Sequence, residues 1–174
     1  MYVKRSKVER PIRTEIGNLL LQYNISAAAY HEGKLNGVHC HRVMQQAKLL
    51  FQQIQEQLMQ TNEAERCDDE KIIFECGLHR DICLTLNTIS SKLRMKHGEP
   101  QPQDYNILQQ TMDNLYYLWS KANLNYTPKI HACLKHAINQ IRRFNGIGDM
   151  LEDDVEHIHQ KAARIETRIG CMKK

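Results

Sequence analysis

The sequence predicts an all-α protein, a single bundle of about six amphipathic helices. Apolar residues recur at steps of three and four along most of the chain, which is the spacing of a helix face. Breaks rich in Gly, Pro and Asn separate these periodic stretches. Aromatic residues are only 6% and prolines only four, a mixture that suits helices better than a sandwich or barrel. The 174 residues fit one domain, so we expect residues 1–174 to share one core.

The first two helices are predicted at residues 12–23 and 43–58. Pro11 is well placed for the first turn of the earlier helix, because its missing N–H needs no partner there. Gly33 and Gly37 mark the loop between the two helices. The apolar positions that define the second helix are Val43, Ala47, Leu50, Phe51, Ile54 and Leu58.

The third helix is predicted at residues 72–93, after a polar loop. The acidic run Asp68-Asp69-Glu70 lies where the positive end of a helix dipole favours carboxylates. Steps of four and three form a heptad-like stripe, which we expect to face the core. The stripe consists of Ile72, Cys76, His79, Cys83, Leu86, Ser90 and Leu93.

The last three helices are predicted at residues 105–122, 130–144 and 151–169. The clearest internal loop, at 98–102, ends the third helix and is too short for a domain linker. Thr127-Pro128 opens the fifth helix, and the glycines of Asn145-Gly146-Ile147-Gly148 suit a left-handed cap at its end. Short connections between six amphipathic helices predict a bundle.

The net charge of +4 permits contact with nucleic acid without arguing for it. The first residues contain no apolar secretory segment, and no apolar run approaches the length of a membrane span. We therefore expect an intracellular protein, nuclear or cytoplasmic, with no membrane partner. Its six cysteines are then expected to be reduced thiols.

Histidines and cysteines form clusters that could ligate a soft metal ion. Cys76, His79 and Cys83 lie three and four residues apart, on one face of a helix, and could hold Zn²⁺ with a fourth ligand from elsewhere. The alternative is core packing, because these positions belong to the predicted buried stripe and a reduced Cys often acts as a small apolar residue. His131 and His136 are five residues apart, which turns them to different faces of their helix.

An acidic cluster begins the last predicted helix. Glu152, Glu156 and His159 follow at i, i+4 and i+7, on one face beside the apolar stripe. Two carboxylates and an imidazole on one exposed face could bind a divalent cation or act as acid and base. The alternative is a solvated first turn whose acids complement the helix dipole.

Basic residues gather near the N-terminus and on the fifth helix. They could contact phosphate groups of DNA, or they could serve only as solubilising charge. The candidate phosphate contacts are Arg5, Lys7, Arg10, Lys135, Arg142 and Arg143.

Two stretches resemble proteins encoded by eukaryotic mobile elements. One runs from Tyr126-Thr127-Pro128-Lys129-Ile130-His131 through His136 and Phe144-Asn145-Gly146-Ile147-Gly148 to Glu152, Glu156 and His159. It is similar to a "TPKxH…H" helix, a "GxG" turn and an "E…E..H" helix in those proteins. The other, residues 29–41, resembles an upstream "YHGGxxxGxHC" segment of the same proteins.

The resemblance implies a helical part of a transposase-like protein of the RNase H fold. By that analogy Glu152 or Glu156 corresponds to the last acid of a metal-binding Asp-Asp-Glu triad, with Mg²⁺ or Mn²⁺ as cofactor and His131 and His136 in support. The two aspartates of that triad lie on or beside strands, and none is predicted here. We therefore do not expect the chain to cut DNA unaided.

The sequence thus predicts a non-catalytic helical module of mobile-element origin that binds nucleic acid or a protein partner. Two alternatives stay open. One is a pure protein-interaction bundle, with a different protein or a second copy as partner. The other is a zinc-stabilised helical domain built on Cys76, His79 and Cys83.

Overall fold

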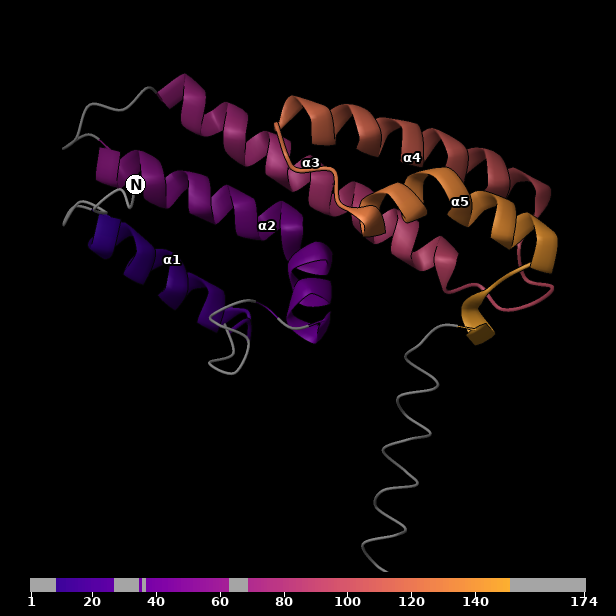
Figure 1. Ribbon diagram of the computed structural model, residues 1–174. Helices are drawn as coiled ribbons and strands as arrows, with labels where there is room; N and C mark the ends of the chain where they lie inside the picture. Colours follow the sequence, from indigo (N-terminus) through magenta and orange to yellow (C-terminus); the bar gives the residue numbers. More distant parts are fainter. Residues whose placement is uncertain (1–8, 27–34, 36, 63–68, 151–174) are drawn as a thin grey trace, which may run out of the picture. The chain divides into compact units, whose positions relative to one another are not determined.

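The computed structural model describes residues 9–26, 35, 37–62 and 69–150 (Figure 1). These residues form α-helices and connecting turns, and none of them lies in a strand. The helices are α1 (Glu9–Gln22), α2 (Gly37–Asn62), α3 (Asp69–Leu93), α4 (Pro102–Lys121) and α5 (Pro128–Phe144), followed by the short 3₁₀ turn η2 (Gly148–Met150). The all-α prediction is confirmed. Five of the six predicted helices are observed, and the sixth, at 151–169, lies outside the described residues.

The chain divides into two compact units that interleave along the sequence. Unit 1 comprises residues 1–88 and 113–125, and unit 2 comprises residues 89–112 and 126–174. Helices α3 and α4 each contribute to both units: most of α3, up to residue 88, belongs to unit 1, and α4 divides near its middle, between residues 112 and 113. Among the described helices, none combines the length and the apolar character needed to cross a membrane.

Unit 1 contains α1, α2, the N-terminal part of α3 and the C-terminal part of α4. The indigo α1 runs beside α2 in Figure 1, and side chains link the two helices. The Tyr23 hydroxyl donates to Gln53 Oε1 over 2.6 Å, and the Gln57 amide donates to Glu15 Oε2 over 3.3 Å. The apolar side chains buried in unit 1 are Ile25, Ala47, Leu50, Cys76, Leu78, Ile82, Leu115 and Leu118.

Unit 2 contains the C-terminal part of α3, the N-terminal part of α4, and α5. Helix α5 lies alongside the N-terminal part of α4 (Figure 1), where the Tyr105 hydroxyl donates to Asn145 Oδ1 over 3.2 Å. The apolar side chains buried in unit 2 are Ile89, Leu108, Met112, Leu134, Ile138 and Ile141. The last three come from α5 and lie on one face of it, so this face holds the helix in place.

The predicted core stripe of α3 needs correction. Of its members only Cys76 is buried, while His79 and Cys83 are partly exposed. The buried positions are Leu78, Ile82, Thr85 and Ile89, which also follow at steps of four, three and four. The central part of α3 therefore carries two neighbouring stripes with the same period, and the spacing alone could not decide which one faces the core.

The start of α4 is fixed by Asp104. One carboxylate oxygen accepts from Lys92 Nζ over 2.6 Å, and the other accepts from the backbone N–H of Gln101 over 2.8 Å. The second bond satisfies a backbone donor at the helix N-terminus, as the acid of a capping box does. The hydrogen bond from Lys92, followed by the bond from Gln101, lowers the pKa of Asp104 below its ordinary value of 3.8.

A pH-dependent contribution to stability follows from this lowered pKa. A carboxyl group whose pKa is lower in the folded state stabilises the fold above its ordinary pKa, and this stabilisation disappears as the pH falls below that value. We expect Asp104→Asn to lower the melting temperature at neutral pH, and the difference from wild type to shrink below the ordinary value of 3.8. Thermal melts followed by circular dichroism over a pH series measure this. Asp113→Asn, at an exposed position of the same helix, is the control; an equal, pH-independent loss in both variants would contradict the prediction.

Candidate nucleic-acid interface

Helix α5 has well-defined ends. Thr127 caps its N-terminus, with the side-chain oxygen accepting from the backbone N–H of Ile130 over 3.4 Å, and Pro128 occupies the first turn. At the other end Asn145 adopts the left-handed conformation, with φ of 48° and ψ of 45°. The sequence analysis predicted that a glycine would adopt the left-handed conformation at this end of the helix. Asn tolerates the conformation as well, and Gly146 follows with φ of 114°.

The turn after α5 is joined to the α3–α4 loop within unit 2. The backbone N–H of Gly98 donates to Asn145 over 2.7 Å, and that of Gly148 donates to Met95 over 2.8 Å. The ring nitrogen Nδ1 of His97 lies 2.7 Å from the Phe144 carbonyl oxygen, which can only accept. These bonds hold the C-terminal end of α5 in a fixed position.

The outer face of α5 is basic. The helix contains four cationic side chains and no acidic residue. Lys129, Lys135, Arg142 and Arg143 are all exposed. At 100° per residue they fall within an arc of about 140°, on the side away from the buried apolar face. From first to last they cover about 21 Å along the helix axis, at a rise of 1.5 Å per residue.

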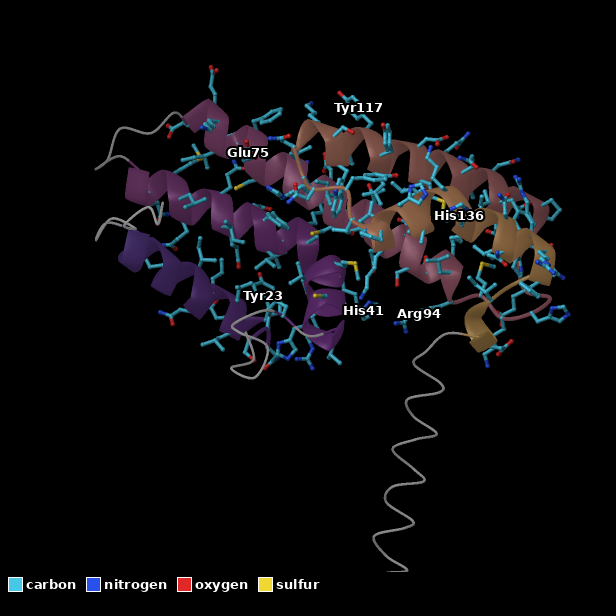
Figure 2. All side chains as sticks on the ribbon, viewed as in Figure 1. Tyr23, His41, Glu75, Arg94, Tyr117 and His136 are labelled. Carbon is cyan, nitrogen blue, oxygen red and sulfur yellow. The ribbon has the colours of Figure 1, made fainter. Side chains whose placement is uncertain are left out.

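Rings accompany the cations on α5. The Arg142 guanidinium lies over the ring of Tyr105, 5.8 Å from its centroid, and that of Arg143 lies 5.3 Å from the centroid of Phe144. Near the N-terminus of α5 the exposed His131 contacts two other exposed rings edge-on. Its centroid is 6.0 Å from that of Tyr126 and 5.3 Å from that of His136, which Figure 2 labels on α5. Tyr105 and Phe144 are partly buried, so the exposed rings of this region are those of Tyr126, His131 and His136. Cations and exposed rings on one surface can contact both phosphates and bases.

The structure adds a contact between His131 and His136 that the sequence analysis did not predict. Five residues apart on a helix, their Cα–Cβ bonds do point in different directions. The imidazole rings nevertheless meet over the helix surface, because the side chains bend toward each other. The two histidines therefore form a pair, and further metal ligands would have to come from elsewhere.

The remaining metal candidates are not assembled in the part of the chain that the structure describes. Glu152, Glu156 and His159 lie outside it. Among the described residues, no three His, Cys, Asp or Glu side chains come together in a way that could hold a metal ion. This includes Cys76, His79 and Cys83, the residues of the predicted zinc site; the His79 ring lies instead 3.8 Å from the Glu75 carboxylate.

The structure describes only part of the basic residues near the N-terminus that were predicted to contact phosphate groups. Arg5 and Lys7 lie outside the described residues. The backbone of Arg10 belongs to α1, and its side chain is outside the described part. Among the predicted phosphate contacts, the structure thus brings together Lys135, Arg142 and Arg143. Sequence reasoning missed Lys129, although the lack of any acid between residues 128 and 144 was visible in the sequence.

The described cysteines are free thiols. Burial raises the pKa of Cys76, helped by the nearby Glu75 carboxylate, and burial alone raises the pKa of Cys133. For Cys83, burial and then the neighbouring Cys40 raise the pKa from 9.0 to about 11. Protonated thiols are poor nucleophiles and poor metal ligands, so these cysteines are suited to packing.

Alkylation measures this difference between the thiols. At pH 8 a thiol with a pKa of about 11 contains about a hundredfold less thiolate than one at 9.0. We expect iodoacetamide to modify the exposed Cys40 well before Cys83, with Cys76 and Cys133 also slow, as followed by peptide mass spectrometry. Modification of Cys83 at the same rate as Cys40 would contradict the assignment of Cys83 to the interior.

Comparisons with known proteins give no match. No protein-family model matches the chain, and neither a curated protein nor a solved structure is significantly similar to it.

Proposed function

We propose that the chain is a non-catalytic helical module that binds nucleic acid through the outer face of α5. One observation supports this most directly: four exposed cations share one side of a helix that has no acidic residue. An acid-free basic face attracts the phosphate backbone and releases its condensed counterions. The buried face of the same helix holds the cations in a fixed arrangement.

The neighbouring rings support single strands or distorted duplex as the preferred ligand. Tyr126, His131 and His136 form an exposed group of rings against which unstacked bases can pack, whereas bases inside a regular duplex present only their edges. The resemblance of these motifs to those of mobile-element proteins is the basis for proposing a transposase-related origin for this face. In that case the candidates for a metal site remain Glu152, Glu156 and His159, which follow the turn at residues 145–148 in the sequence. The module would then position DNA for cleavage elsewhere.

Removing charge from α5 tests the proposal. We expect Lys135→Gln combined with Arg142→Gln to weaken binding to a labelled 20-nucleotide single strand roughly tenfold or more at low salt, because two charge-assisted contacts are lost. Fluorescence anisotropy measures the affinity. The matched control is Lys71→Gln combined with Lys121→Gln, which removes the same charge from exposed positions of α3 and α4. Equal weakening by both pairs would indicate nonspecific attraction and contradict an α5 interface.

A protein-interaction module is the second candidate. Phe74 on α3 and Tyr117 on α4, the latter labelled in Figure 2, are 45% and 59% exposed within unit 1. Lys121 Nζ lies 4.9 Å from the first ring centroid and 5.7 Å from the second, so the two rings border a common patch. Exposed aromatic residues of this kind are enriched in protein interfaces. Analytical ultracentrifugation of wild type and Phe74→Ser distinguishes the two candidates: self-association that this substitution abolishes would favour the protein interface, with a second copy as partner.

A further inference from the structure

A second site is suggested by a cavity in unit 1, between α2 and α3. Its volume is about 190 Å³, and it is lined by Lys48, Phe51, Gln52, Gln55, Cys76 and Arg80. Pockets that enclose a drug-sized ligand are larger, so this cavity suits a ligand of which one part stays in solvent.

The lining residues follow from helix geometry. On α2 the positions 48, 51, 52 and 55 stand at i, i+3, i+4 and i+7, which places them on one face. On α3 Cys76 and Arg80 are four residues apart and also share a face. The cavity therefore has ordered walls built on two helices, which position side chains better than loops do.

The charge of the lining favours an anion. Among the residues that the structure describes, two cations line the cavity and no acidic side chain does. Arg80 Nε pairs with Asp81 Oδ1 over 2.9 Å, which orients the guanidinium and leaves its other nitrogens for a second partner. Glu56 accepts a bond from the Gln52 amide over 3.0 Å. The Cys76 thiol is buried, and its raised pKa keeps it neutral, so it offers an apolar surface that does not repel an anion.

The other lining groups favour a ligand in which the anionic group is attached to a planar ring system that forms hydrogen bonds. The Phe51 ring offers a surface on which a base can stack. The amide nitrogens of Gln52 and Gln55 already donate to Glu56 and Met59, and their amide oxygens can accept from the edge of a base. Two cations on separate helices suit a doubly charged phosphomonoester better than a single carboxylate.

We propose that this cavity binds one nucleotide, with its phosphate held by Lys48 and Arg80 and its base against Phe51. The nucleotide can be free in solution or part of a strand, since both present the same phosphate and base. The cavity shares no residue with the basic face of α5, so free nucleotide should bind even when the α5 charges are removed.

Calorimetric titration of the full chain with 5′-AMP tests the proposal. We expect AMP to bind roughly tenfold more tightly than adenosine or inorganic phosphate, because each of these lacks one half of the contacts. Arg80→Gln and Lys48→Gln should each weaken AMP binding by a similar factor, and Phe51→Leu should weaken AMP while leaving inorganic phosphate unchanged. Lys71→Gln, an exposed cation on α3 outside the cavity, is the control. Circular dichroism verifies that each variant is folded.

The outcomes distinguish a free nucleotide from a nucleotide within a strand, and binding in the cavity from binding on the basic face of α5. AMP binding that depends on Arg80 supports a free nucleotide as ligand. If AMP does not bind but a 15-nucleotide strand binds with an affinity that depends on Arg80, the ligand is a nucleotide within a strand. If the strand's affinity depends on Lys135 and Arg142 but not on Arg80 or Lys48, and AMP does not bind, the cavity proposal is overturned while the α5 proposal stands.

Discussion

Gly146→Ala is expected to destabilise the protein by roughly 3 kcal/mol or more, the largest effect of an added methyl group among the described glycines. A Cβ built at this position lies 2.6 Å from the carbonyl carbon of Lys96 and 3.0 Å from the backbone nitrogen of His97. Both neighbours are backbone atoms, which cannot swing aside as the end of a side chain can. The φ of 114° adds strain, because residues with a Cβ rarely adopt it.

Gly148→Ala should also be strongly destabilising, for the steric reason alone. Its added Cβ would lie 2.6 Å from the carbonyl carbon of Arg94. Thermal or urea unfolding measures both variants. Gly17→Ala in α1, where nothing lies within 4 Å of the added Cβ, is the control and should be neutral or mildly stabilising. Unchanged stability of Gly146→Ala would mean that the turn after α5 does not approach the α3–α4 loop.

Ile141→Ala is expected to cost about 3 kcal/mol, within the range of 2–5 kcal/mol seen for large-to-small changes of buried aliphatic residues. Its side chain is 2% exposed and belongs to the buried face of α5. The cost combines the lost transfer free energy of the removed atoms with the cavity left behind. Urea unfolding measures the loss.

A graded series distinguishes packing from other effects. Ile141→Val should cost only about 1 kcal/mol, because one methylene group is removed. Gln140→Ala, at an exposed position one residue away, should change stability by less than about 0.5 kcal/mol. A loss for Ile141→Ala no larger than that for Gln140→Ala would show that α5 is not held by its apolar face.

The sequence predicted the five described helices, and it predicted the bounds of α5 best because clear start and stop signals flank that helix. Thr127-Pro128 and Asn145-Gly146 bound α5 as expected, and Leu134, Ile138 and Ile141 form its buried face. The observed α2 starts earlier than predicted, at Gly37, because a glycine can be the first residue of a helix as well as part of a loop. The buried stripe of α3 was predicted wrongly. Two neighbouring stripes on this helix have the same spacing, and the spacing does not show which of them packs against other helices.

The candidate site was harder to predict, since its contacts depend on rotamers and on segments far apart in the sequence. The pairing of His131 with His136 needs both side chains to bend, and residue spacing does not report that. The "GxG" turn suggested a mobile-element motif. Its glycines also have a structural explanation, because the backbone of residues 94–97 occupies the space that any side chain at Gly146 or Gly148 would need.

The most direct test of the α5 interface is the salt dependence of wild-type binding to labelled single-stranded and duplex DNA. Four phosphate contacts predict a slope of log K against log salt of about −3 for a single strand and about −3.6 for a duplex. We expect these slopes for wild type. For the Lys135→Gln, Arg142→Gln variant we expect shallower slopes, reduced by the amount that the loss of two phosphate contacts predicts. No binding at low salt, or a slope that this variant leaves unchanged, would contradict a nucleic-acid interface on α5.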